Sequence, residues 1–204
     1  DLDVTDPLGP DQYGYYIYDS NDIDYDLSPE YDWIEIDPGL GGNGTDLNLS
    51  DSGDGNWSGN GPIADVNLPF TFRFYGIEYN SITVSTNGWI APGGSGAASF
   101  RNYPIPGAGG PSPMIAAFWD DLETTSSGDV FVYSTNQYVI IEWSEMRTNN
   151  QNSLETFQII LFNDSSQPNG DNSIKIQYKE FDNDSSGSYG SYPPMHGGYA
   201  TIGI

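Results

Sequence analysis

The chain has 204 residues, enough for one domain with a substantial core, and 29 acidic against 5 basic residues leave it a formal charge of −24. This charge repels nucleic-acid phosphates and anionic lipid head groups, so we expect no nucleic-acid partner and no membrane insertion. The lack of cysteine excludes disulfides and thiol chemistry, and no run of about 18 apolar residues is present to span a bilayer.

Composition predicts an all-β fold, because aromatic residues favour strands while the abundant Gly, Asn, Asp and Ser favour turns. The acidic first segment, residues 1–38, contains two short predicted strands, YGYYIY at 13–18 and YDWIEI at 31–36. Residues 39–62 predict a long surface loop that holds one short strand in TDLNL, 45–49. Loops of this length are uncommon unless they have a function.

The centre and the C-terminal half give the clearest strand predictions. In LPFTFRFYG, Phe70, Phe72 and Phe74 alternate with other residues, the period of a half-buried strand, and YNSITVSTNGWIAPG follows with a turn at Asn87 and Gly88. After a Gly- and Pro-rich stretch, further strands are predicted in MIAAFWDD, GDVFVYS, QYVIIEWSEM, ETFQIILFN, NSIKIQYKEF and GYATIGI. This spacing predicts a single antiparallel β-sandwich, jelly-roll-like, over residues 1–204, with long Gly-, Asn-, Asp- and Ser-rich loops.

The order of these blocks over residues 68–204 resembles the nidogen-type extracellular (NIDO-like) domain. That family typically shows Phe-Tyr-Gly, Asn-Gly, Phe-Trp-x-Asp, a strand with Trp, Phe-Gln and a closing Gly, and the chain has all of them in order. The preceding GPDQYGYYIYDSND and YDWIEI resemble the leader of a bacterial form, found beside secreted peptidases and in surface proteins. The resemblance implies an extracellular or cell-surface, non-enzymatic module for adhesion or assembly.

Two acidic clusters are candidate calcium sites. Asp120 and Asp121 follow a predicted buried strand, where adjacent side chains point to opposite faces, so only one is expected to turn inward and a catalytic pair is not expected. They either bind a cation together with loop oxygens or form a polar strand end that hydrogen-bonds a neighbouring loop. The second cluster, DSNDIDYD at 19–26, offers Asp19, Asp22 and Asp24, without the spacing of a helix–loop–helix calcium site.

Several other motifs bear on the extracellular interpretation. The only histidine, His196, cannot form a multi-histidine metal site and is expected to lie in a solvated loop. Asn-x-Ser/Thr sequons in predicted loops permit glycosylation, at Asn43, Asn48, Asn56, Asn163 and Asn183. The start at Asp1 without an apolar leader is what a mature secreted chain is expected to show. A further set of side chains is able to stack on sugars or simply to pack in the fold: Tyr13, Tyr15, Tyr16 and Tyr18.

The N-terminal arm, residues 1–12, is the predicted assembly element. Its apolar residues are Leu2, Val4 and Leu8, and the first two alternate with acids, so the arm is able to add as a strand to the sheet of a neighbouring copy. Repeated head to tail, this donation builds a homopolymeric filament. The arm folding back on its own domain is the competing interpretation. A carbohydrate- or protein-binding accessory domain of a secreted peptidase is the alternative function, and a glycosidase, supported only by the many acidic residues, comes third.

Overall fold

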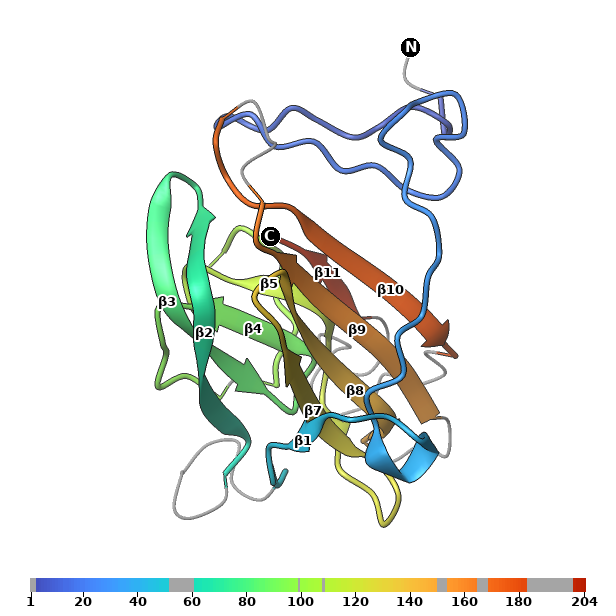
Figure 1. The fold of residues 1–204 in the computed structure, drawn as a ribbon, viewed down its shortest axis with the longest axis vertical. Helices are drawn as coiled ribbons and strands as arrows, with labels where there is room; N and C mark the ends of the chain where they lie inside the picture. The colour runs from blue at the N-terminus through green and yellow to red at the C-terminus, as the bar shows by residue number, and fades with distance from the viewer. Residues whose placement is uncertain are drawn as a thin grey trace, which may run out of the picture.

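The computed structural model describes residues 3–51, 61–98, 100–107, 109–149, 154–164, 169–182 and 200–204, and its strands form two antiparallel sheets packed face to face (Figure 1). The predicted β-sandwich is therefore confirmed. Within these residues the helical structure is limited to one 3₁₀ turn, η1 (Pro38–Leu40), so the described chain contains no helix of the length and apolar character needed to cross a membrane.

The first sheet has the strand order β1-β7-β8-β9-β10, with the short β6 paired to β8 as well. Strands β7 to β10 are consecutive along the chain and adjacent in the sheet, so they form a meander. The bounds are β1 (Thr45–Asp46), β6 (Leu122–Glu123), β7 (Asp129–Ser134), β8 (Tyr138–Thr148), β9 (Leu154–Phe162) and β10 (Ile174–Glu180). The strand predicted within residues 45–49 is present as β1.

The second sheet has the order β11-β5-β4-β3-β2. Its bounds are β2 (Ile63–Phe74), β3 (Ile77–Ser85), β4 (Trp89–Pro92), β5 (Ile115–Trp119) and β11 (Thr201–Gly203). The predicted turn at Asn87 and Gly88 joins β3 to β4, and Gly88 has a positive φ of 74°. A Cβ added there would lie 1.8 Å from the Phe118 carbonyl oxygen of β5, so only glycine fits this turn against the next strand.

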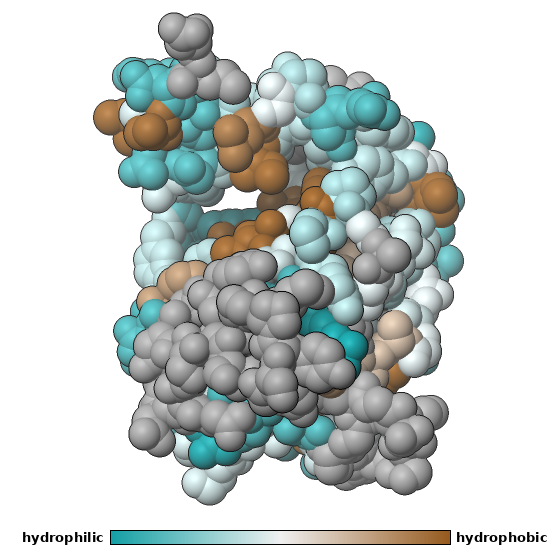
Figure 2. All heavy atoms as spheres, turned by 180° about the vertical axis from the view of Figure 1, so that it is seen from behind, coloured by the Kyte–Doolittle hydropathy of each residue, from teal (hydrophilic) through white to brown (hydrophobic). Residues whose placement is uncertain are grey.

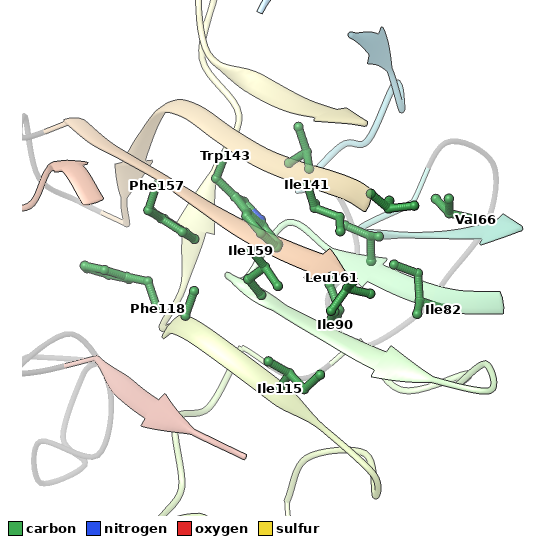
Figure 3. Packing of buried hydrophobic residues seen from close by; sticks show 14 of the residues in the cluster. Val66, Ile82, Ile90, Ile115, Phe118, Ile141, Trp143, Phe157, Ile159 and Leu161 are labelled. Atoms are coloured by element: carbon green, nitrogen blue, oxygen red, sulfur yellow. The ribbon is translucent and has the colours of Figure 1, made fainter. Parts of the chain in front are cut away.

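The main core lies between the sheets. Alternation places Ile141 and Trp143 of β8 and Phe157 of β9 on the inner face, where all three are fully buried. Figure 3 shows Phe118 of the second sheet facing Phe157, and their rings stack with centroids 5.5 Å apart. The Trp143 indole stacks on Phe157 at 5.0 Å and donates a hydrogen bond to the Ser85 carbonyl oxygen at 2.8 Å. Aromatic packing therefore fixes the two sheets together.

Two strand predictions in the first segment are wrong. Residues 13–18 form no strand, although Ile17 makes an isolated antiparallel bridge with Leu8. Residues 31–36 also form no strand, because this segment crosses the strands of the first sheet instead of running beside one of them (Figure 1). Its backbone is bound by side chains of the sheet, so no ladder of backbone hydrogen bonds forms.

Candidate functional site

Asp120 and Asp121 lie where the chain passes from β5 of the second sheet to β6 of the first. Both are buried, so the expectation that only one turns inward is wrong: a crossover between packed sheets encloses both sides of the chain. Asp120 Oδ1 accepts the Asp121 N–H at 2.8 Å, and Asp121 Oδ2 accepts the Asn149 side-chain amide at 2.6 Å. Asn87 Oδ1 accepts the Leu122 N–H at 3.0 Å. These contacts are those of a polar strand end bound to neighbouring loops.

The predicted calcium ligands do not gather into a carboxylate cage. Within the described ranges, no group of three or more His, Cys, Asp or Glu side chains is placed to hold a metal ion. Asp22 is the buried member of the second cluster, and its Oδ2 accepts the Asp19 N–H at 2.8 Å, while Asp19 and Asp24 are exposed. Calcium at either cluster therefore stays a prediction.

The glycosylation candidates that the structure describes lie on the surface. Asn43, Asn48 and Asn163 are exposed, as attachment of a sugar requires. Asn56 and Asn183 lie outside the described residues, as does His196.

Residues 3–30 form an irregular lobe at one end of the sandwich, which we call the N-terminal lobe (Figure 1). Its main anchor is Asp171, a fully buried carboxylate in the loop before β10. Asp171 accepts hydrogen bonds from the hydroxyls of Tyr15 at 2.8 Å and Tyr13 at 3.4 Å, and from the Gly76 N–H at 3.2 Å. Arg73 Nε completes the shell at 3.3 Å. Burial and the Asp171 bond raise the pKa of Tyr15 above its usual range, so Tyr15 stays a neutral donor.

A second contact joins the lobe to the turn after β2. Tyr75 packs its ring against Tyr15 at 4.8 Å and Tyr13 at 5.2 Å, and its hydroxyl donates to Asp11 Oδ2 at 2.7 Å. The same Asp11 accepts three backbone N–H groups through Oδ1. Two of the four tyrosines considered for sugar stacking are therefore occupied in attaching the lobe, whereas Tyr16 stays about half exposed.

The lobe leaves the apolar residues of the predicted arm in water. Val4 is 79% exposed and Leu8 is 61% exposed, while Leu2 lies outside the described residues. Leu8 exchanges two backbone hydrogen bonds with Ile17, at 2.8 and 2.9 Å. The described arm thus turns back within its own chain at Leu8, and its other apolar side chain stays uncovered.

Residues 31–37, which we call the strap, continue from the lobe across the outer face of the first sheet. The Gln177 side chain of β10 binds the Asp32 backbone on both sides, accepting its N–H at 3.3 Å and donating to its carbonyl at 2.9 Å. Gln158 of β9 donates to the Ile34 carbonyl at 2.7 Å and to Glu142 Oε2 at 2.6 Å. The paired register of Gln177, Gln158 and Glu142 makes them one row across three strands.

The row ends on β8, where Glu142 and Ser144 bind the last part of the strap. The Ile36 N–H donates to Glu142 Oε2 at 3.2 Å, and the Ser144 hydroxyl donates to Asp37 Oδ2 at 2.7 Å. Ile36 is buried among outer-face apolar residues that include Ile140 and Phe131. The strap is therefore a fitted cover, with backbone groups satisfied at alternate residues and one isoleucine in an apolar site.

Two glutamates meet beneath this cover. Glu35 of the strap binds Lys179 Nζ at 2.9 Å, Trp33 Nε1 at 3.2 Å and the Asp37 N–H at 3.0 Å. Burial opposes ionisation of Glu35, but the bonds from Lys179 and Glu142 outweigh it and lower its pKa. Burial is the main reason that the pKa of Glu142 is raised to about 8. The hydrogen bond to Glu35 and the charge of Glu35 act in the same direction, whereas the hydrogen bond from Gln158 lowers the pKa. One glutamate thus holds the charge and the other the proton.

Neither this row nor the Asp171 anchor was predicted from the sequence. Glu142, Gln158 and Gln177 occupy the polar positions of strands that alternate with apolar ones, which is also the pattern of a solvent-facing surface. The one signal available was the YDWIEI segment, whose alternating acids and apolar residues need a covering partner. Asp171 stands in a polar loop and carries no signal of its own.

The comparisons with known proteins agree with this fold. A family model described as "NIDO related" matches residues 43–204, which is well over half of the chain and leaves the lobe and the strap outside the match. No curated protein and no solved structure matches the chain.

Proposed function

The chain belongs to the NIDO-related family, and on that premise we propose that it is a non-catalytic extracellular module that associates with further copies of itself through its N-terminal lobe. Modules of this family are generally extracellular and are not enzymes. The observation that carries the proposal is the apolar surface of the lobe. A segment that served only as a linker would not need exposed apolar side chains.

This surface is formed by aliphatic side chains that remain in water. The most exposed of these side chains are Val4 at 79%, Ile23 at 77%, Leu27 at 62% and Leu8 at 61%. Elsewhere on the described chain, few large apolar residues are exposed. Figure 2 shows apolar spheres on the lobe, which stands at the top of the molecule. Clustered exposed apolar side chains mark a contact surface more often than a solvent-facing one. We therefore place the contact between copies on this lobe.

The acceptor in the next copy is the edge of the first sheet at β10. Edge strands offer unpaired backbone groups for an added strand. Alternation puts Lys175 and Lys179 of β10 on the outer face beside Gln177, while Ile176 and Tyr178 face the core. Two of the five basic residues of this acidic chain are therefore on this one edge. Charge complementarity favours an acidic donor strand from a second copy.

The donor is the start of the arm, before the bridge between Leu8 and Ile17. Residues 1–6 alternate in the required way, with Leu2 and Val4 on one side and Asp1 and Asp3 on the other. Added along β10, this stretch puts its apolar side chains next to the core row and its acids next to the lysines. Because donor and acceptor are different surfaces, repeated addition gives a filament.

The test is the association state of the full chain and of charge-reversed variants. We expect sedimentation and electron microscopy at increasing concentration to show multimers that shorten or disappear on deleting residues 1–6. Asp3→Lys and Lys175→Glu are each expected to weaken association, and the two changes combined in one chain to restore part of it. A monomer at all concentrations, unaffected by these changes, would overturn the proposal.

A second candidate, binding of a glycan or protein as an accessory module of a secreted peptidase, is favoured by one observation. On the lobe, the ring centroid of Tyr18 lies 6.3 Å from that of Tyr16 and 6.2 Å from that of Tyr25, and the Tyr25 hydroxyl donates to the Asp6 carboxylate at 2.8 Å. Aromatic rings beside carboxylates are able to bind sugars. Glycan-array binding that is lost in Tyr16→Ala, by a chain that stays monomeric, would favour this candidate over self-association.

We also propose that the lobe binds calcium at Asp22. Asp22 is 1% exposed, and its Oδ1 has no hydrogen-bond partner among the described residues, which is unusual for a carboxylate on an otherwise exposed turn. A cation held by this oxygen and by backbone carbonyls would satisfy it. We expect added calcium to raise the melting temperature of the wild type and to have no effect on Asp22→Asn; equal behaviour of the two would contradict calcium at this site.

A further inference from the structure

Contacts between the strap and the first sheet converge on one buried carboxyl group, that of Glu142. Glu142 is fully buried. Its Oε2 accepts hydrogen bonds from the Gln158 amide and the Ile36 N–H, whereas no donor among the described residues binds its Oε1. An ionised carboxylate needs several donors when it is removed from water. Glu142 has donors for one oxygen only, so its neutral form is the one that fits the closed strap.

The neighbouring glutamate completes the arrangement. Glu35 is supplied with three donors, from Lys179, Trp33 and Asp37, and so carries the negative charge. A protonated Glu142 is able to donate to it, whereas an ionised Glu142 would place two like charges together in a buried site. The contact between strap and sheet is thus attractive in one protonation state and repulsive in the other.

We propose that Glu35 and Glu142 form a proton-operated latch: the strap stays on the first sheet while Glu142 keeps its proton, and loss of that proton releases the strap together with the attached end of the lobe.

The charges around the latch are of both signs. Lys179 is bound to Glu35 and its charge also acts on Glu142, and Lys175 lies on the same outer face of β10. Among the acidic groups, Asp37 is bound to Ser144 of β8, Asp37 and Asp46 act on Asp129, and Glu180 acts on Lys179. The acidic groups do not stabilise an ionised Glu142, and the nearest cation, Lys179, is already held by Glu35. The raised pKa of Glu142, about 8, agrees with this geometry, so the contribution of its proton to closing falls as the pH rises above the ordinary carboxyl value and is lost by about pH 8. At the acid end, protonation of Glu35 removes the bond to Lys179, so the closed form has a window between the two pKa values.

Release has a consequence for self-association, and this step rests on the proposed function. The strap crosses β10 at Gln177 and occupies Lys179 through Glu35. An open strap therefore frees Lys179 and the outer side of the β10 edge, where we place the donated arm of a second copy. We expect association to be faster above pH 8 than at pH 6.

The latch is tested by amide exchange in the strap of the full chain, at a concentration where it is monomeric. Glu142→Gln is neutral at every pH and keeps the size of the side chain, so comparing wild type with this variant at each pH cancels the chemical pH dependence of exchange. In the open form Glu142 should have an ordinary carboxyl pKa. We therefore expect the exchange rate of the strap in the wild type, divided by that in the variant, to rise on the order of tenfold to a hundredfold between pH 6 and 9. Residues 157–161 of β9 serve as the internal control, with an unchanged ratio.

A ratio that stays constant from pH 6 to 9 would overturn the latch. If Glu142→Gln does not fold, the carbon-13 titration of the Glu142 carboxyl in the wild type decides: a midpoint near 8 supports the latch, and one below 5 overturns it. Because these measurements use the monomer, they test the latch independently of self-association. A negative result for the latch would not bear on self-association, and the absence of self-association would not bear on the latch.

Discussion

The two faces of the first sheet are both buried, yet they are covered by different partners. On the inner face, Ile141, Trp143 and Phe157 meet the side chains of the second sheet. On the outer face, the alternate positions Glu142 and Gln158 meet the backbone of the strap. The inner face is apolar because side chains cover it. The outer face carries a polar row beside its apolar residues, because an extended backbone brings N–H and C=O groups that need partners.

The comparison shows why buried polar residues occur in the middle of apolar strands here. The strap cannot pair as a strand, since it runs across the sheet, so its backbone is satisfied by long polar side chains at every second residue. The same side chains would be costly against an apolar partner. The strap and its row therefore form one structural unit, and substitutions in this unit should have effects distinct from those of substitutions in the core.

Removing an aromatic ring from the inner face should destabilise the whole molecule. Phe157→Ala takes away the ring stacked between Phe118 and Trp143, and we expect the free energy of unfolding to fall by about 3–5 kcal/mol in urea denaturation. Exchange should then increase in strands of both sheets. A loss confined to the strap would contradict the assignment of the core to the space between the sheets.

On the outer face, the effect of Glu142→Gln should depend on pH. Because the folded-state pKa of Glu142 is raised to about 8, the wild type binds a proton that the unfolded chain has lost, and this contribution is present at acid pH and disappears as pH rises from its ordinary value to about 8. We expect equal free energies of unfolding near pH 5 and a variant more stable by roughly 4 kcal/mol at pH 9. Parallel curves for the two proteins would show that Glu142 does not titrate in this way.

Breaking the row without changing charge should loosen only the strap. Gln158→Leu keeps the size of the side chain but removes the donor to the Ile34 carbonyl and one of the two donors to Glu142 Oε2, at a cost of about 2 kcal/mol in local opening. Amide exchange of residues 31–37 measures this opening. The matched control is Gln137→Leu, an exposed glutamine, for which we expect a change within about 0.5 kcal/mol.

The smallest effect on stability is expected at the lobe surface. Val4→Ser alters a side chain that is 79% exposed, so the free energy of unfolding should change by less than about 0.5 kcal/mol. The same substitution should reduce self-association, measured by sedimentation. Thr5→Ser, at the exposed neighbouring residue, is the control that should leave association unchanged.

Most of the sandwich follows from local pattern. Alternation in β2 correctly placed Phe72 and Phe74 on one face, where both are buried in the core, and the turn at Asn87 and Gly88 was predictable because few dipeptides adopt its backbone geometry. The order of these blocks also carried the family resemblance, which the matching family model confirms over residues 43–204.

By itself the sequence determined which residues share a face of each strand, because side-chain direction is a local property with a period of two. Only the tertiary structure decided what covers that face. Glu142 meets Ile36 across 106 positions of the chain, and Gln177 meets Asp32 across 145, so polar positions that read as solvent-facing are buried under the strap. Such contacts depend on where a remote segment crosses the sheet, and no local pattern in either segment records that crossing.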